Sequence, residues 1–137
     1  MKHFSIYILA TISTTALASP CTGIDRTLTE ERKAILLPII TKQVAQQLHN
    51  VESVEVLQSF HYRDWYIINV NTHVSDEGYL FYKGDPSKNN YLTILAGAYT
   101  KDDERFVLKS IQDGKAKGIP KALARCIAWH VTKGQSQ

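Results

Sequence analysis

Neither sign of charge dominates the sequence, which also has few glycines and prolines and only 2 cysteines. Its 16 basic residues stand against 13 acidic ones, which gives a formal net charge of +3 without any block of lysine or arginine. That near balance argues against a nucleic-acid-binding protein. Only 7 Gly and 4 Pro occur among 137 residues, and 44% of the residues are hydrophobic. This composition excludes collagen-like, low-complexity and wholly disordered chains and suits one globular domain.

The sequence also lacks the spacings that mark common catalytic and cofactor sites. Its histidines form no H-E-x-x-H or H-x-H pattern, its serines lie in no G-x-S-x-G, and its glycines are too far apart for a phosphate-binding loop. We therefore predict no metal site, no cofactor and no enzymatic activity.

The N-terminus has the pattern of an export signal. Lys2 and His3 precede a mostly apolar stretch over 4–12, and small residues follow up to Ala16-Leu17-Ala18. The apolar stretch is much shorter than the roughly 20 residues that span a bilayer. We predict a signal peptide over 1–18, cleaved near Ala18, and a single domain over 19–137 in the periplasm or outside the cell, without a stable membrane anchor.

The mature chain would contain two cysteines, Cys21 and Cys126, one near each end. An even number of cysteines in an exported chain favours a disulfide. Lipid attachment at Cys21 is disfavoured because Pro20 stands where lipoprotein signals carry a small residue. A catalytic thiol at Cys126 would leave Cys21 without a partner, so we predict a structural Cys21–Cys126 bridge.

Hydrophobic spacing predicts the order of the helices and strands. Thr29 is a good N-cap for a helix that ends at His49-Asn50, with Pro38 expected to kink it or to begin its second part. Strands are predicted over 54–60, 65–72, 79–82 and 91–99, joined by polar turns into an antiparallel meander. Two further helices follow, one after Thr100 and one after Pro120.

This order predicts an α+β domain with an N-terminal helix, a four-stranded antiparallel meander and two C-terminal helices packed on one sheet face. We expect all the helices to lie against the same face. The turns at Asp64 and Asp85 should then share one end of the sheet, with Asp76 and Glu77 at the other. The opposite face should present exposed aromatic side chains.

Such an aromatic face, rimmed by charged turn residues, is typical of a protein-binding surface, because Tyr, Trp and Arg dominate interface hot spots. We predict that the chain is a small exported protein-binding module, an inhibitor or immunity protein that neutralises an envelope-targeting hydrolase or toxin. The predicted interface residues are Tyr62, Arg63, Asp64, Tyr66, Asp76, Glu77, Tyr82 and Asp85.

Two alternatives remain open from the sequence. The first is a small periplasmic hydrolase that uses His61, His73 and the turn carboxylates. The second is a carrier that holds a small apolar ligand between the sheet and a helix. An inhibitor should form a complex with another protein, a hydrolase should lose turnover when a histidine is replaced, and a carrier should retain a small molecule on purification.

Overall fold

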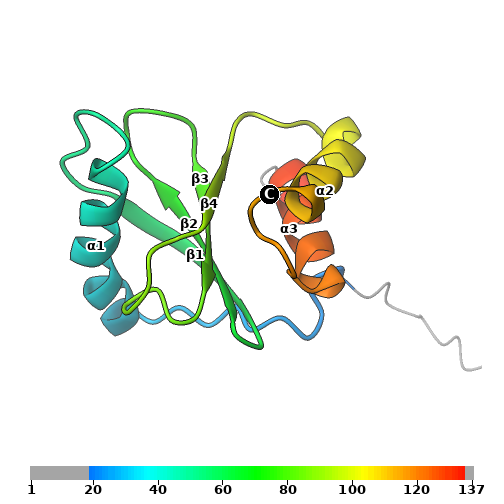
Figure 1. The fold of residues 1–137 in the computed structure, drawn as a ribbon, viewed down its shortest axis with the longest axis horizontal. Helices are drawn as coiled ribbons and strands as arrows, with labels where there is room; N and C mark the ends of the chain where they lie inside the picture. The colour runs from blue at the N-terminus through cyan, green and yellow to red at the C-terminus, as the bar shows by residue number, and fades with distance from the viewer. Residues whose placement is uncertain (1–18, 135–137) are drawn as a thin grey trace, which may run out of the picture.

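A computed structural model describes residues 19–134, and its element order confirms the predicted α+β fold (Figure 1). One helix precedes a four-stranded sheet, and two helices follow it. The elements are α1 (Glu30–Ala45), β1 (Glu55–Tyr62), β2 (Trp65–Asn71), β3 (Gly78–Lys83), β4 (Thr93–Ala96), the short 3-10 helix η1 (Lys101–Asp103), α2 (Glu104–Asp113) and α3 (Lys121–Lys133).

The strands form one antiparallel meander in the order β1-β2-β3-β4, as predicted. Tyr62 pairs with Trp65, so Arg63 and Asp64 make the whole turn between β1 and β2. Trp65 also pairs with Lys83, the last residue of β3. The β1–β2 turn and the loop after β3 therefore lie at the same end of the sheet, which confirms the predicted arrangement of the turns.

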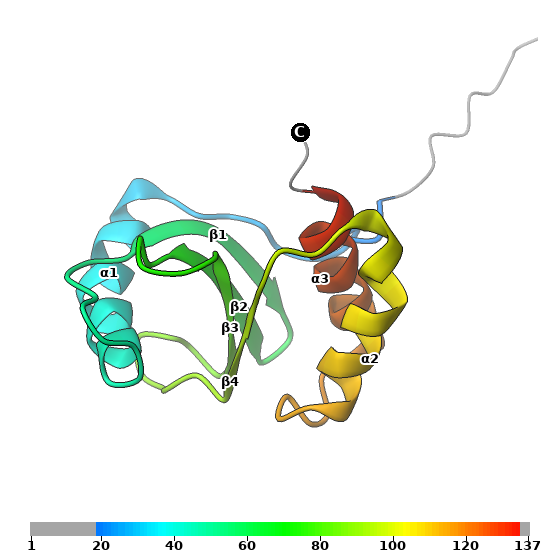
Figure 2. The same cartoon turned by 90° about the horizontal axis from the view of Figure 1, so that it is seen from above.

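The sheet is covered on both faces, so the expectation that all helices share one face is wrong. Helix α1 packs on one face, and α2 with α3 packs on the other (Figure 2). Successive side chains of a strand point to opposite faces of the sheet, so Ile67 packs in the core between the sheet and α2/α3, and Ile68 packs in the core between the sheet and α1. The α1 core is built from Leu36, Ile40, Val44, Val54, Val56, Ile68, Val70, Leu80 and Tyr82.

The exposed aromatic face is consequently absent from the described residues. Trp65, Tyr79, Phe81 and Tyr82 are each at most 2% exposed. The physical reason lies in the strands themselves, which carry nearly continuous apolar runs over 65–70 and 79–82. Such runs are typical of strands buried on both faces, whereas strands with one wet face alternate apolar and polar residues.

Helix α1 begins as predicted, but Pro38 does not divide it. The Thr29 hydroxyl accepts a hydrogen bond from the Arg32 N–H at 3.1 Å, which caps the helix. The helix then continues through Pro38 to Ala45. Pro38 lies on the exposed side, where water can satisfy the Ala34 carbonyl that the proline leaves without an N–H partner.

The N-terminal segment is fastened to both the sheet and α3. Cys21 forms the predicted disulfide with Cys126 in α3, with an S–S distance of 2.11 Å. Asp25 and His61 exchange backbone hydrogen bonds of 2.9 and 2.8 Å, which extends the sheet beyond β1.

The predicted signal peptide lies outside the described residues. Within 19–134, no helix is both long enough and apolar enough to cross a membrane.

Candidate functional site

Most of the predicted interface residues gather at one end of the sheet, around the β1–β2 turn. The loop after β3 is joined to this turn because the Gly84 N–H donates a hydrogen bond of 2.6 Å to the Asp64 carbonyl. We call this region the hairpin-end surface. It comprises Tyr62, Arg63, Asp64, Tyr66 and Asp85.

Arg63 occupies an unusual backbone conformation at the tip of this surface. Its φ is 56°, in the left-handed region that favours glycine. Asn50 and His73 also have positive φ values, but Asn and His adopt this conformation far more readily than Arg. The turn thus holds an exposed cationic side chain at a position where glycine would be the least strained choice.

Aromatic rings flank Arg63 on both sides of the hairpin. The guanidinium carbon of Arg63 lies 5.0 Å from the centre of the Tyr62 ring. On the α1 side, the His61 and Tyr66 rings stack with their centres 3.9 Å apart. The His61 Nε2–H donates to the Arg63 carbonyl at 2.7 Å, which fixes the ring beside the turn. Sequence reasoning did not include His61 in the protein-binding surface.

The Asp85 carboxylate holds the neighbouring loop in place. It forms an ion pair of 2.7 Å with Arg32 in the first turn of α1, and it accepts hydrogen bonds from the Ser87 N–H and hydroxyl. Partial burial opposes ionisation, but the Ser87 and Arg32 hydrogen bonds outweigh it and lower the pKa of Asp85 to about 2. Asp85 therefore shapes the hairpin-end surface by fixing the loop to α1.

The structure separates the other predicted residues from this surface. Tyr82 is fully buried and donates its hydroxyl to Gln43 at 2.6 Å, and burial raises the pKa of its phenol. It supports Tyr66, its cross-strand neighbour, from within the core. Asp76 and Glu77 lie in the β2–β3 connection at the opposite end of the sheet. The predicted eight residues thus do not form one continuous surface.

Replacing Arg63 with Gly should remove the side chain without weakening the fold. The substitution relieves left-handed strain of about 1–2 kcal/mol, while glycine costs about 0.5–1 kcal/mol of unfolded-state entropy. The exposed Arg63–Tyr62 contact is worth at most about 1 kcal/mol. We expect the free energy of unfolding to stay within about 1 kcal/mol of the unsubstituted protein in urea titration. A larger loss would show that Arg63 stabilises the turn.

The histidines of the hydrolase alternative lie at opposite ends of β2. His61 pairs with Tyr66 near the start of that strand, whereas His73 follows its end. His73 instead borders an open depression of about 310 Å³ with Glu52 and Ser53. The Ser53 hydroxyl donates to the Val54 carbonyl at 3.4 Å, away from the hydrogen bond that a serine nucleophile makes with its base.

The sequence did not predict the buried polar pair of Tyr79 and His130 in the α2/α3 core. The Tyr79 hydroxyl lies 3.0 Å from Nδ1 of His130, and the Phe60 ring meets the His130 ring edge to face. Burial, reinforced by the nearby Arg26 charge, lowers the pKa of His130 to about 4. The available signal was its helical spacing from Leu123 and Ile127, which places His130 on the buried side of α3.

Within residues 19–134, no three His, Cys, Asp or Glu side chains are arranged to hold a metal ion. Comparisons with known proteins give no functional assignment. No family model matches the chain, and no curated protein or solved structure matches it either.

Proposed function

We propose that the mature chain is an exported protein-binding module that inhibits or neutralises another protein, a hydrolase of the cell envelope or a toxin directed at it. The observation that carries the proposal is Arg63, a cation held in left-handed backbone at an exposed turn. Strained conformations persist where the surroundings enforce them, and they concentrate at functional sites.

The side chains around Arg63 support a protein partner. Tyr62, Tyr66 and His61 provide partly exposed rings beside the cation, and Tyr and Arg are the residue types enriched in interface hot spots. The hydrogen bonds of His61 and Asp85 hold the turn and the adjoining loop in one arrangement. A surface ordered before binding loses little conformational freedom when a partner docks, which favours tight inhibition.

The alternatives have less geometric support. The hydrolase alternative needs His61, His73 and the turn carboxylates together, but the two histidines lie at opposite ends of β2 and the Asp85 carboxylate is paired with Arg32. For the carrier alternative, the pocket between β4 and α2 has a volume of about 210 Å³, below the roughly 300–1,000 Å³ usual for small-molecule sites. The hollow between α1 and the start of β1 has about 380 Å³, but it is an open depression whose lining includes Glu30, Lys33 and Glu55, so it does not enclose an apolar ligand.

Affinity capture from an envelope extract tests the proposal. The baits are tagged mature protein, the Arg63→Gly variant and the His73→Gly variant. His73 is a matched control because its φ is 64° and it lies at the other end of the sheet. We expect a stoichiometric protein partner on the unsubstituted bait and on His73→Gly, with at least tenfold less on Arg63→Gly.

Two outcomes would contradict the proposal. One is equal capture of the partner by Arg63→Gly, which would remove the hairpin-end surface from the interaction. The other is the absence of any stoichiometric partner from extracts of both the producing cells and competing cells. Hydrolase and ligand-binding assays would then take precedence.

A further inference from the structure

The two edges of the sheet differ in how they are protected against pairing with another strand. Edge strand β1 has a register shift between Val56 and Gln58, and Asp25 pairs with it at His61. Edge strand β4 consists of Thr-Ile-Leu-Ala, without a charged residue, a proline or a bulge. Proteins normally blunt free edges with such features or by keeping the strand very short, and β4 has only its short length of 4 residues, so it is the less protected of the two edges.

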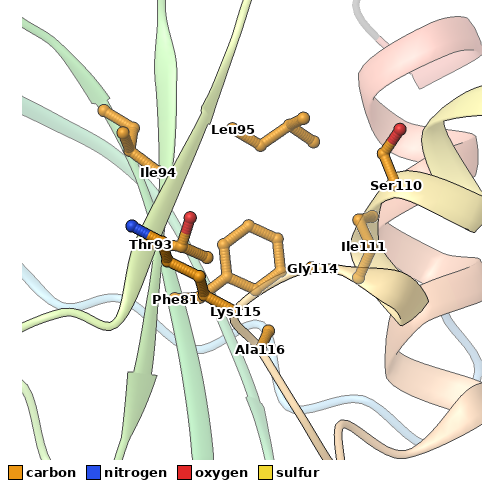
Figure 3. Close-up of a pocket in the computed structure, with 9 residues that line it drawn as sticks. All are labelled: Phe81, Thr93, Ile94, Leu95, Ser110, Ile111, Gly114, Lys115 and Ala116. Atoms are coloured by element: carbon orange, nitrogen blue, oxygen red, sulfur yellow. The ribbon is translucent and has the colours of Figure 1, made fainter.

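A pocket of about 210 Å³ lies beside β4, between the strand and the end of α2 (Figure 3). Thr93 and Leu95 line it from the strand, and Ile111 and Ala116 line it from the helix and the following loop. Lys115 also lines the pocket together with Thr93, and its side chain overlaps the β4 ribbon in this view. The volume is suited to one inserted side chain.

Phe106 protrudes near this pocket. It is 63% exposed, more than the other large hydrophobic side chains that residues 19–134 expose. Phe106 shares a helix face with Ser110, which lines the pocket, and lies one turn closer to the start of α2. Strand β4 and helix α2 run in opposite directions (Figure 1). Phe106 stands near the start of α2, and the pocket is lined by residues at the end of α2, so we infer that Phe106 lies toward the Ala96 end of β4 and the pocket toward its Thr93 end.

We propose that two copies of the chain associate by antiparallel pairing of β4 with β4, which joins their sheets. A two-fold axis between the strands sets the Thr93 end of each copy beside the Ala96 end of the other. Each Phe106 is thereby brought toward the partner's pocket, so that the protruding ring and the hollow complement each other. This pairing does not depend on the proposed function of the hairpin-end surface.

The same two-fold axis also relates the charged residues beside β4 in the two copies. Lys115 lies at the Thr93 end. At the Ala96 end, Tyr99 donates its hydroxyl to the Ala96 carbonyl, and the next residue, Thr100, donates its N–H to the Asp103 carboxylate. Asp103 stands among charges of both signs, with Asp102 and with Glu104, which pairs with Lys133, beside Lys101 and Arg105. Antiparallel pairing brings Lys115 of each copy toward Asp103 of the other, and these two opposite charges attract. These charges favour a second copy as the occupant of this edge.

Sedimentation equilibrium of the disulfide-bonded mature protein, over a range of concentrations, tests the pairing. We expect a monomer–dimer equilibrium whose dissociation constant rises at least tenfold in Phe106→Ser. Ile35→Ser is the matched control, because Ile35 is also exposed but lies on α1. It should leave the dissociation constant unchanged. Lys115→Glu should weaken the dimer too, because it opposes the partner's Asp103 with a like charge.

The proposal is overturned if the protein is monomeric at every concentration. It is also overturned if a dimer forms but is unaffected by both Phe106→Ser and Lys115→Glu, since the contact would then use another surface. Both substitutions are at exposed positions, so circular dichroism should show an intact fold in each variant. Loss of hairpin-end binding in capture experiments would leave this result unchanged.

Discussion

Removing the disulfide should lower the free energy of unfolding by about 4–5 kcal/mol, because the bridge joins residues 105 positions apart. Cross-linking so long a loop strongly restricts the unfolded chain. Domains of this size are stable by only about 5–15 kcal/mol in total. The bridge also fastens the segment that contains Asp25, which pairs with the β1 edge. A Cys21→Ser/Cys126→Ser protein should therefore be marginal at growth temperature.

Urea titration of the oxidised protein, the reduced protein and the double serine variant measures this contribution. Reduced protein and double variant should unfold at similar, much lower urea concentrations than the oxidised protein. Equal midpoints for all three would contradict the expected role of the bridge. The reduced sample controls for any packing change introduced by serine.

Acidification should destabilise the protein by about 3 kcal/mol between pH 6.5 and pH 4 through His130. The folded protein holds the pKa of His130 near 4, whereas an unfolded histidine has a pKa of about 6.5. As the pH falls through this window, the unfolded chain takes up a proton that the folded protein does not. Above pH 6.5 both states are neutral at this residue, and below pH 4 both become protonated, so stability changes only in between.

His130→Asn removes this titration while keeping a polar atom near the Tyr79 hydroxyl. The free energy of unfolding of the variant should therefore change much less between pH 6.5 and pH 4 than that of the unsubstituted protein. Asp85 does not interfere, because its pKa near 2 places its own loss of stability below about pH 4. An identical pH dependence in both proteins would show that other groups cause the acid destabilisation.

The strand topology could be predicted from local signals, and the disulfide by elimination. Thr29 identified the start of α1, and polar turns separated the strands of the meander. Cys21 and Cys126 had only each other as partners. The number of covered sheet faces is a tertiary property. Apolar residues at successive positions of β2 and β3 indicate a sheet covered on both faces, but the same residues also fit an exposed aromatic face when only their type is considered.

The candidate site was predictable only in part, because the burial of a side chain is also a tertiary property. Alternation of the turns correctly placed Asp64 and Asp85 at one end and Asp76 at the other. Exposure could not be derived from residue type, so Tyr82 was included although α1 covers it. The left-handed backbone of Arg63 gives no local sequence signal, because such a turn ordinarily calls for glycine.

The most direct measurement is titration of the captured partner's activity with protein that comprises residues 19–137. If the chain is an inhibitor or immunity protein, one equivalent of unsubstituted protein or of His73→Gly should abolish that activity. Arg63→Gly, although folded, should need at least tenfold more. Full partner activity in the presence of excess unsubstituted protein, or equal inhibition by Arg63→Gly, would contradict neutralisation through the hairpin-end surface.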